Sequence, residues 1–143
     1  MALVQCHMTT LAEFDKLDIE DPLQLDSIAR SGIHSRVAMA LGQRFEISQD
    51  SLSELISIPK RTLHRKVERE ETLKQDESER VLRVGKLYRR ALQVFEDPKQ
   101  ATKWFSSKPK ALAGKTPLEL MKTEFGARLV EDLLGRIEHG VFS

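Results

Sequence analysis

Residues 49–67 read QDSLSELISIPKRTLHRKV, and this stretch decides the fold. Its apolar residues recur at helical spacing on both sides of Ser57-Ile58-Pro59, which interrupts the pattern. The spacing predicts two short helices and a tight turn, with Ile58 filling the turn and Ser53 allowing the helices to approach. Helix-turn-helix DNA-binding proteins are built in this way, although many have Gly where this chain has Ser57.

The second helix of this pair carries the basic residues of the stretch, Lys60, Arg61, Arg65 and Lys66. Arg can donate two hydrogen bonds to guanine O6 and N7 in the major groove, and Lys and Thr can hold phosphates. The alternative interpretation is an ordinary helical bundle with a solvated basic face. If the stretch binds DNA, the residues expected to face it are Ser48, Gln49, Lys60, Arg61, Thr62, His64, Arg65 and Lys66.

The composition restricts the classes of protein that fit. The chain has 143 residues, of which 40% are hydrophobic and 31% charged, and its formal net charge is +1. Any affinity for DNA must therefore come from a local patch. The single cysteine, Cys6, makes no intramolecular disulfide, which fits a reducing cytoplasm. We find no signal peptide and no membrane span, so we expect a cytoplasmic protein without a membrane partner.

The rest of the chain predicts an all-α fold, because apolar residues recur every three or four positions. Residues 1–21 form an acidic leader, for which a short docked helix or strand and disorder are both open. Helices over 23–29 and 34–45, followed by an N-cap at Ser48, complete a helix-turn-helix domain at 22–72. The polar residues 69–74 mark the predicted boundary to a small helical domain at 76–143.

The second domain begins with a helix predicted to run to about Phe95. Its basic side is expected to be solvated and consists of Arg80, Arg83, Lys86, Arg89 and Arg90. Thr116-Pro117-Leu118-Glu119 signals the start of a short helix. Thr123 is expected to cap a last helix over 124–138, which Gly140 ends. Its predicted inward stripe is Phe125, Leu129, Val130, Leu133, Leu134 and Ile137.

Two glycines inside that last helix predict a close neighbour. Gly126 and Gly135 each cost about 1 kcal/mol relative to Ala in a helix. The neighbour can belong to the same domain or to a partner protein.

Residues suited to catalysis or metal binding are scattered. The chain has four histidines and one cysteine, without a recognisable metal-ligand spacing. It has no Gly-rich phosphate loop and no spacing that supports a Ser-His-Asp triad. We therefore expect a binding module with no catalytic residue, no metal site and no cofactor.

Several motifs of the chain resemble a known family. They are PKRTLHRK at 59–66, SERVLR at 78–83, Trp104, PKALAGKTPLELM at 109–121 and GARLVEDLLGRIEHGVFS at 126–143. They resemble the Xre/MbcA/ParS-type antitoxins, in which a helix-turn-helix half precedes a toxin-binding half. The resemblance covers about 28–143. The chain departs from the family pattern at Ser57, Phe105 and Ala113.

The resemblance implies an antitoxin of a bacterial type II toxin–antitoxin pair. Its partner would be a RES- or ParT-like toxin that acts on NAD, with a RES toxin favoured. The antitoxin would cover the active-site entrance of the toxin and repress its own promoter. The residues implied to contact the toxin are Trp104, Arg128, Arg136, Glu138, His139, Val141, Phe142 and Ser143.

Two of these residues can instead have a structural role, since Trp104 can belong to the core and Phe142 can pack on its own domain.

We expect a homodimer on operator DNA, because such motifs usually act on paired half-sites. Its surface is expected on the helices between residues 22 and 45 or on the helix over 82–95. The alternative functions are a stand-alone transcription regulator with a C-terminal dimerisation or ligand-sensing half, and an adaptor that binds only protein.

Overall fold

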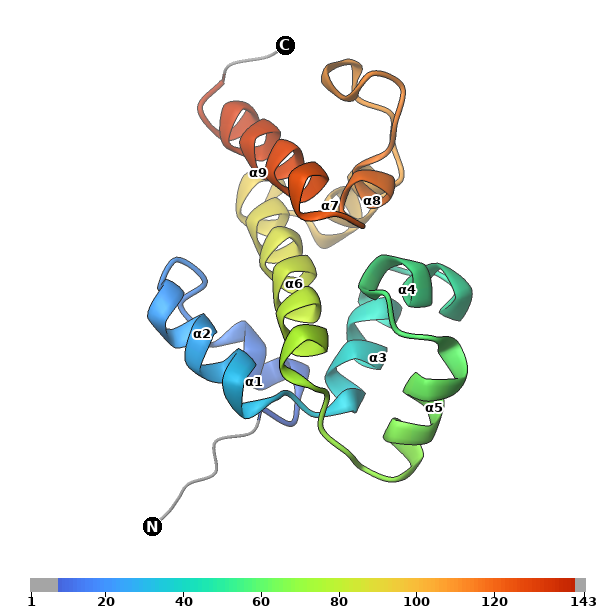
Figure 1. Cartoon of the computed structure of the whole chain (residues 1–143). Coiled ribbons are helices and arrows are strands. Elements are labelled where there is room, and N and C mark those ends of the chain that lie inside the picture. Colours follow the sequence, from blue (N-terminus) through green and yellow to red (C-terminus); the bar gives the residue numbers. More distant parts are fainter. Residues whose placement is uncertain (1–7, 141–143) are drawn as a thin grey trace. The chain divides into compact units, whose positions relative to one another are not determined.

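The computed structural model describes residues 8–140, and every regular element in that range is a helix (Figure 1). Two isolated β-bridges, Met8 with Ile33 and His34 with Thr72, are the only strand-like pairings among these residues. The predicted all-α fold is thus confirmed. The chain divides into two compact units, Met1–Leu82 and Arg83–Ser143.

The first unit is built from short capped helices. They are α1 (Leu11–Asp15), α2 (Pro22–Ser31), α3 (Ser35–Arg44), α4 (Gln49–Ile56), α5 (Lys60–Glu68) and the start of α6 (Gln75–Phe95). The Asp21 carboxylate accepts from the Leu23 N–H at the start of α2, and the Ser48 hydroxyl accepts from the Ser51 N–H at the start of α4. Gly32 ends α2 at φ +86°. These ends agree with the predicted helices, because short-range signals determine them.

Helices α3, α4 and α5 contact one another and enclose the core of the first unit. Buried apolar side chains there come from all three helices and the turn, and they include Val37, Leu41, Leu52, Leu55, Ile56, Ile58 and Leu63. This three-helix arrangement contains the predicted helix-turn-helix pair, α4 and α5.

The described part of the leader also belongs to the first unit. Phe14 and Ile19 are only 2% and 3% exposed. Arg44 of α3 donates to both carboxylate oxygens of Asp15, at 2.8 and 2.9 Å. Of the interpretations left open for the leader, residues 8–21 adopt the docked helix, and residues 1–7 lie outside the described range.

Residues 69–74, the predicted boundary, are held within the first unit. Leu73 is 3% exposed, and its N–H donates to the carbonyl of Ile33 at 2.7 Å. The Ser35 N–H donates to the carbonyl of Glu71 at 3.0 Å. The division between the units therefore falls later, inside α6 between Leu82 and Arg83. The polar composition of residues 69–74 indicated a linker, but their backbone is hydrogen-bonded to Ile33 and Ser35 at the start of α3.

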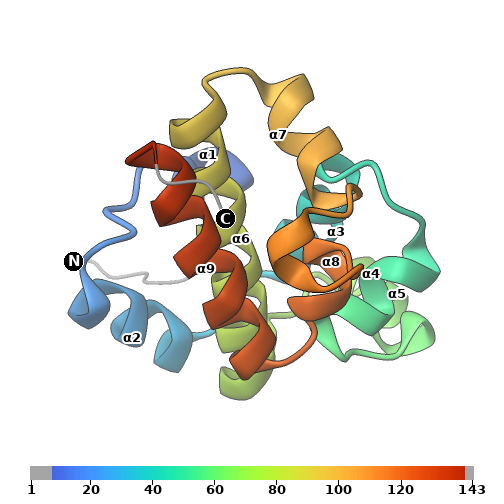
Figure 2. The same cartoon turned by 90° about the horizontal axis from the view of Figure 1, so that it is seen from above.

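The second unit contains the rest of α6, followed by α7 (Pro98–Phe105), the 3-10 helix η1 (Lys110–Leu112), α8 (Pro117–Leu120) and α9 (Glu124–Glu138). Helix α8 contacts both α7 and α9 (Figure 2). The Thr116 hydroxyl accepts from the Glu119 N–H, and the Thr123 hydroxyl accepts from the Gly126 N–H. Both threonines therefore cap helices as predicted.

The two glycines of α9 have different surroundings. A Cβ at Gly126 would lie 1.9 Å from the carbonyl oxygen of Leu120, so only Gly allows α8 and α9 to approach this closely. The predicted close neighbour of Gly126 is confirmed and lies in the same unit. A Cβ at Gly135 would meet nothing nearer than Nη2 of Arg90, at 3.8 Å, which is an ordinary contact.

The basic side of α6 is not the solvated face that was predicted. The side chains of Arg80, Lys86 and Arg90 are only 24%, 29% and 21% exposed. Within the second unit, Lys86 Nζ lies 3.3 Å from Glu131 Oε2, and Arg90 Nη2 lies 3.6 Å from Glu138 Oε1. The prediction was wrong because residues distant in sequence provide the partners. Acidic residues of α9 pair with Lys86 and Arg90, and the carbonyls of Ile56 and Ser57 accept from Arg80.

Candidate functional site

The turn between α4 and α5 fixes the position of α5. Ser57 lies in the left-handed region at φ +55°, where Gly is common in such turns. Ile58 is fully buried beneath the turn, and Ser53 Oγ donates to its carbonyl at 2.7 Å. Ile58 therefore fills the turn as the sequence predicted, and Ser53 holds the turn through its hydroxyl.

Helix α5 and the start of α4 form one polar surface. Arg61 and Arg65 lie one helical turn apart, and both are exposed. His64 Nε2 is hydrogen-bonded to Gln49 Oε1, and Lys60 Nζ forms a 2.9 Å ion pair with Asp50 Oδ1. We call this surface the α5 polar face and define it as Gln49, Lys60, Arg61, His64 and Arg65.

Three other residues predicted to contact DNA lie at different positions. Ser48 is exposed at the start of α4, where its hydroxyl caps the helix. Thr62 is half-buried. Lys66 is 7% exposed, and its Nζ donates to Glu77 Oε1 at 2.9 Å.

The prediction that Lys66 belongs to the DNA-facing side is wrong. Lys66 follows the buried Leu63 by three positions, so both side chains lie on the inner side of α5. That spacing and the acidic residues at the start of α6 were the signals that could have located it.

Helix α9 exposes two apolar side chains that were predicted to point inward. Phe125 is 83% exposed and Leu129 is 53% exposed, whereas Val130 and Leu134 are fully buried. The predicted stripe of six residues was too wide for one face of a helix, and that width was the overlooked signal. Phe125, Leu129 and Arg136 follow one another at spacings of four and seven, so they share a face with Asp132. We call these four residues the α9 outer face.

An open groove lies beside this face, between α6 and the last turns of α9. Its lining residues are Arg90, Glu131, Asp132, Gly135, Arg136 and His139. The absence of a side chain at Gly135 leaves room in this groove. The structure thus brings Arg136 and His139, two of the predicted toxin-contacting residues, to one place, with Glu138 bound to Arg90 nearby.

The remaining residues predicted to contact the toxin do not line this groove. Trp104 is half-buried, with its ring 5.7 Å from Phe95 and 5.3 Å from Phe105 between centroids. Arg128 is exposed on α9, and its Nη2 lies 3.4 Å from Glu124 Oε1. Val141, Phe142 and Ser143 lie outside the described residues.

The described residues show neither a metal site nor a membrane span. Between residues 8 and 140, no three His, Cys, Asp or Glu side chains come together in a group that could hold a metal ion. None of the helices in that part of the chain is both long and apolar enough to cross a membrane.

Each of the two units contains a region that matches the model of a known domain family. Residues 24–85 match the family model of the antitoxin Xre-like helix-turn-helix domain, and residues 90–140 match the antitoxin Xre/MbcA/ParS C-terminal toxin-binding domain. The chain belongs to the Xre/MbcA/ParS antitoxin family. The first match contains the α5 polar face, and the second contains the α9 outer face and the groove.

Curated relatives support the same family. A protein named antitoxin Xre from Yersinia enterocolitica is 40% identical over 87 residues, which is 60% of this chain and 59% of that protein. An antitoxin Xre from Pseudomonas putida is 35% identical over 83 residues, covering 58% of this chain and 52% of the relative. The match therefore spans a little over half the length of these relatives.

Proposed function

We propose that this chain is the antitoxin of a type II toxin–antitoxin pair, which binds its toxin through the second unit and its promoter through the α5 polar face. The observation that carries the proposal is the presence of two matched domains in one chain, each with a surface suited to its partner. One surface is polar and partly cationic, and the other combines exposed apolar side chains with arginine.

The proposed DNA contacts are Arg61 and Arg65 to base edges, with Lys60, His64, Gln49, Ser48 and Thr62 nearer the phosphates. Exposed arginines on the second helix of the motif have the chemistry that reads guanine. The net charge of +1 provides no general attraction to DNA, so affinity depends on this surface. We propose a homodimer whose two α5 helices occupy half-sites about 34 Å apart, and autorepression as the consequence.

The proposed toxin contacts lie on and beside the α9 outer face. Exposed apolar side chains of this size mark interaction sites when they occur together, and aromatic residues and Arg are the usual anchors of interfaces. Phe125 and Leu129 supply the apolar part, and Arg128, Arg136, Glu138 and His139 supply polar neighbours. The proposal also includes Trp104 and the terminal residues Val141, Phe142 and Ser143.

The proposed toxin is of the RES type, which degrades NAD, and the antitoxin blocks the entrance to its active site. The NAD chemistry belongs to the toxin, so this chain needs no cofactor. A ParT-like toxin, which modifies a protein, is the alternative partner.

The test is co-expression with the product of the reading frame adjacent to this gene. Expression of that product alone should stop growth and deplete NAD, and this chain should restore both. Growth arrest with unchanged NAD would point to the ParT-like alternative. Failure to restore growth, together with a shift of promoter DNA, would identify a stand-alone regulator and contradict the antitoxin assignment.

A further inference from the structure

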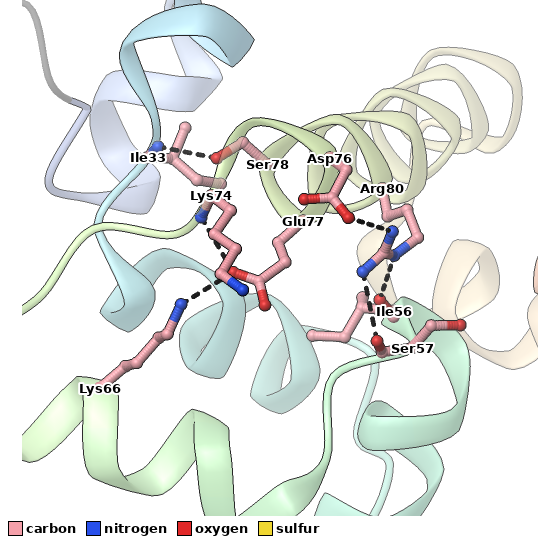
Figure 3. Close-up of polar contacts among 9 residues, drawn as sticks. All are labelled: Ile33, Ile56, Ser57, Lys66, Lys74, Asp76, Glu77, Ser78 and Arg80. Atoms are coloured by element: carbon pink, nitrogen blue, oxygen red, sulfur yellow. Dashed lines mark hydrogen bonds and ion pairs between the residues drawn. The ribbon is translucent and has the colours of Figure 1, made fainter.

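The first turns of α6 are attached to both helices of the proposed DNA-reading pair (Figure 3). Glu77 Oε1 accepts from Lys66 Nζ on α5 and from the Lys74 N–H, each at 2.9 Å. Arg80 Nε donates to the carbonyl of Ile56 at 2.7 Å, and its Nη2 donates to the carbonyl of Ser57 at 3.2 Å. One segment therefore holds both α5 and the turn that precedes it.

The contact between Glu77 and Lys66 is a buried ion pair, with the two residues 8% and 7% exposed. Burial by itself would raise the pKa of Glu77, but hydrogen bonds from the Lys74 N–H and the Lys66 ammonium lower it below its usual value. The carboxylate is therefore charged at neutral pH. Buried ion pairs add little net stability compared with apolar residues, but they can favour one arrangement over its alternatives.

Lys66 occupies a position from which it can orient α5. It follows directly after the exposed Arg65, roughly 100° further around the helix, and its side chain is buried. Its ammonium is bound to a carboxylate that is itself fixed by the Lys74 N–H. A rotation of α5 about its axis would break this pair, so the pair sets the direction in which Arg61 and Arg65 project.

Arg80 acts on the turn. The carbonyls of Ile56 and Ser57 lie at the C-terminal end of α4, where helix carbonyls have no partner within the helix and the helix dipole is negative. The Arg80 guanidinium satisfies both of them, and Asp76 Oδ2 lies 3.4 Å from its Nη1. The contact fixes the left-handed Ser57 and, through it, the start of α5.

Ser78, between these two residues, anchors the same segment to the core of the first unit. Its Oγ accepts from the Ile33 N–H at 3.0 Å, and Ser78 is fully buried. The base from which Glu77 and Arg80 reach α4 and α5 is therefore itself fixed.

We infer that Glu77 and Arg80 are positioning residues for DNA recognition, which hold α5 and the α4–α5 turn in the orientation that reads a specific sequence. This inference rests on the proposed DNA binding. If it holds, the residues needed for DNA recognition extend into the first turns of α6, beyond those that contact DNA.

The experiment compares full-length variants in promoter binding. Lys66→Met combined with Glu77→Gln removes both buried charges together, and the amide oxygen of Gln can still accept from the Lys74 N–H. Arg80→Ala removes the guanidinium from the turn, and Arg80→Lys restores one of its donors. Arg30→Ala is the matched control, because Arg30 is a 67% exposed cation of the same unit whose partner is Asp26.

The readouts are the melting temperature and the dissociation constants for promoter DNA and for unrelated DNA of equal length. We expect the double variant and Arg80→Ala to bind promoter DNA about ten- to a hundredfold more weakly, comparable to the loss of a bidentate base contact. Affinity for unrelated DNA should change little, because it depends on charge rather than on orientation. Arg80→Lys should recover part of the loss, and Arg30→Ala should behave as wild type.

The outcomes separate the inference from the function on which it rests. A wild-type chain that does not bind promoter DNA overturns both. If the wild type binds and the folded variants retain its ratio of specific to unrelated affinity, the inference alone is overturned. An equal loss in Arg30→Ala also overturns it, because the effect would then be one of general charge.

Discussion

Helices α5 and α9 depart from the simple amphipathic pattern in opposite directions. On α5 a cation, Lys66, is buried in an ion pair. On α9 two apolar residues, Phe125 and Leu129, remain in water. A surface that meets DNA can be polar throughout, so its helix can be fully satisfied in the free protein. A surface that meets another protein exposes apolar residues that only the partner covers, and this difference indicates the class of partner for each helix.

The largest effect should follow from removing the exposed apolar pair. We expect Phe125→Ala with Leu129→Ala to weaken toxin binding by about 2–4 kcal/mol if Phe125 is an interface anchor. The melting temperature should change little, because both side chains are already exposed. Calorimetric titration with the toxin measures the loss. Leu23→Ala is the matched control, since Leu23 is an 80% exposed residue of the first unit; an equal loss there would refute the assignment.

The next effect concerns stability of the second unit. Gly126→Ala places a Cβ against the Leu120 carbonyl and should destabilise this unit by about 3 kcal/mol. Gly135→Ala should instead stabilise it by about 1 kcal/mol, because Ala favours helix and meets no tight contact. The single tryptophan, Trp104, reports the melting of this unit by fluorescence. Similar melting temperatures for the two variants would contradict the described packing of α9.

Gly135→Ala also sharpens the comparison between stability and binding. If the groove beside Gly135 is part of the toxin interface, the more stable variant should bind toxin less tightly. An increase in stability without loss of affinity would remove the groove from the interface and leave the α9 outer face.

The smallest expected effect is a pH dependence of stability, and it concerns the first unit only. His34 Nδ1 accepts from the Arg36 N–H at the start of α3, and burial together with the charge of Arg36 lowers the pKa of His34. Because the folded pKa lies below the unfolded value of about 6.5, stability should decrease as the pH falls through that value towards the folded pKa. His34→Asn keeps a good N-cap and should remove this decrease.

Thermal melts by circular dichroism between pH 7 and pH 5 measure this loss of stability. Trp104 fluorescence is the internal control, because it reports the second unit. A decrease that persists unchanged in the Asn variant would show that another group is responsible.

The sequence predicted those features that depend on residues close together in the chain. Ser48 and Thr123 cap their helices, and Ser57-Ile58 forms the turn, because each acts on neighbours a few positions away. The motifs also predicted the family. The buried side of α5 and the end of the first unit were harder to predict, because Lys66 binds Glu77, eleven positions away, and Leu73 pairs with Ile33. Helical spacing shows which residues share a side of α5 or α9, but it does not identify the partners of Lys66 and Leu73, which depend on how the helices are arranged.

The central claim is that α5 and α9 serve separate partners, and one crossed experiment tests it. Arg61→Ala with Arg65→Ala, and Phe125→Ala with Leu129→Ala, are each measured for promoter binding and for toxin binding in the full-length protein. The arginine variant should lose about 1–3 kcal/mol of promoter binding per base contact and keep its toxin affinity. The apolar variant should lose toxin binding and keep its promoter affinity. Loss of both activities in either variant, or of neither, would contradict the account.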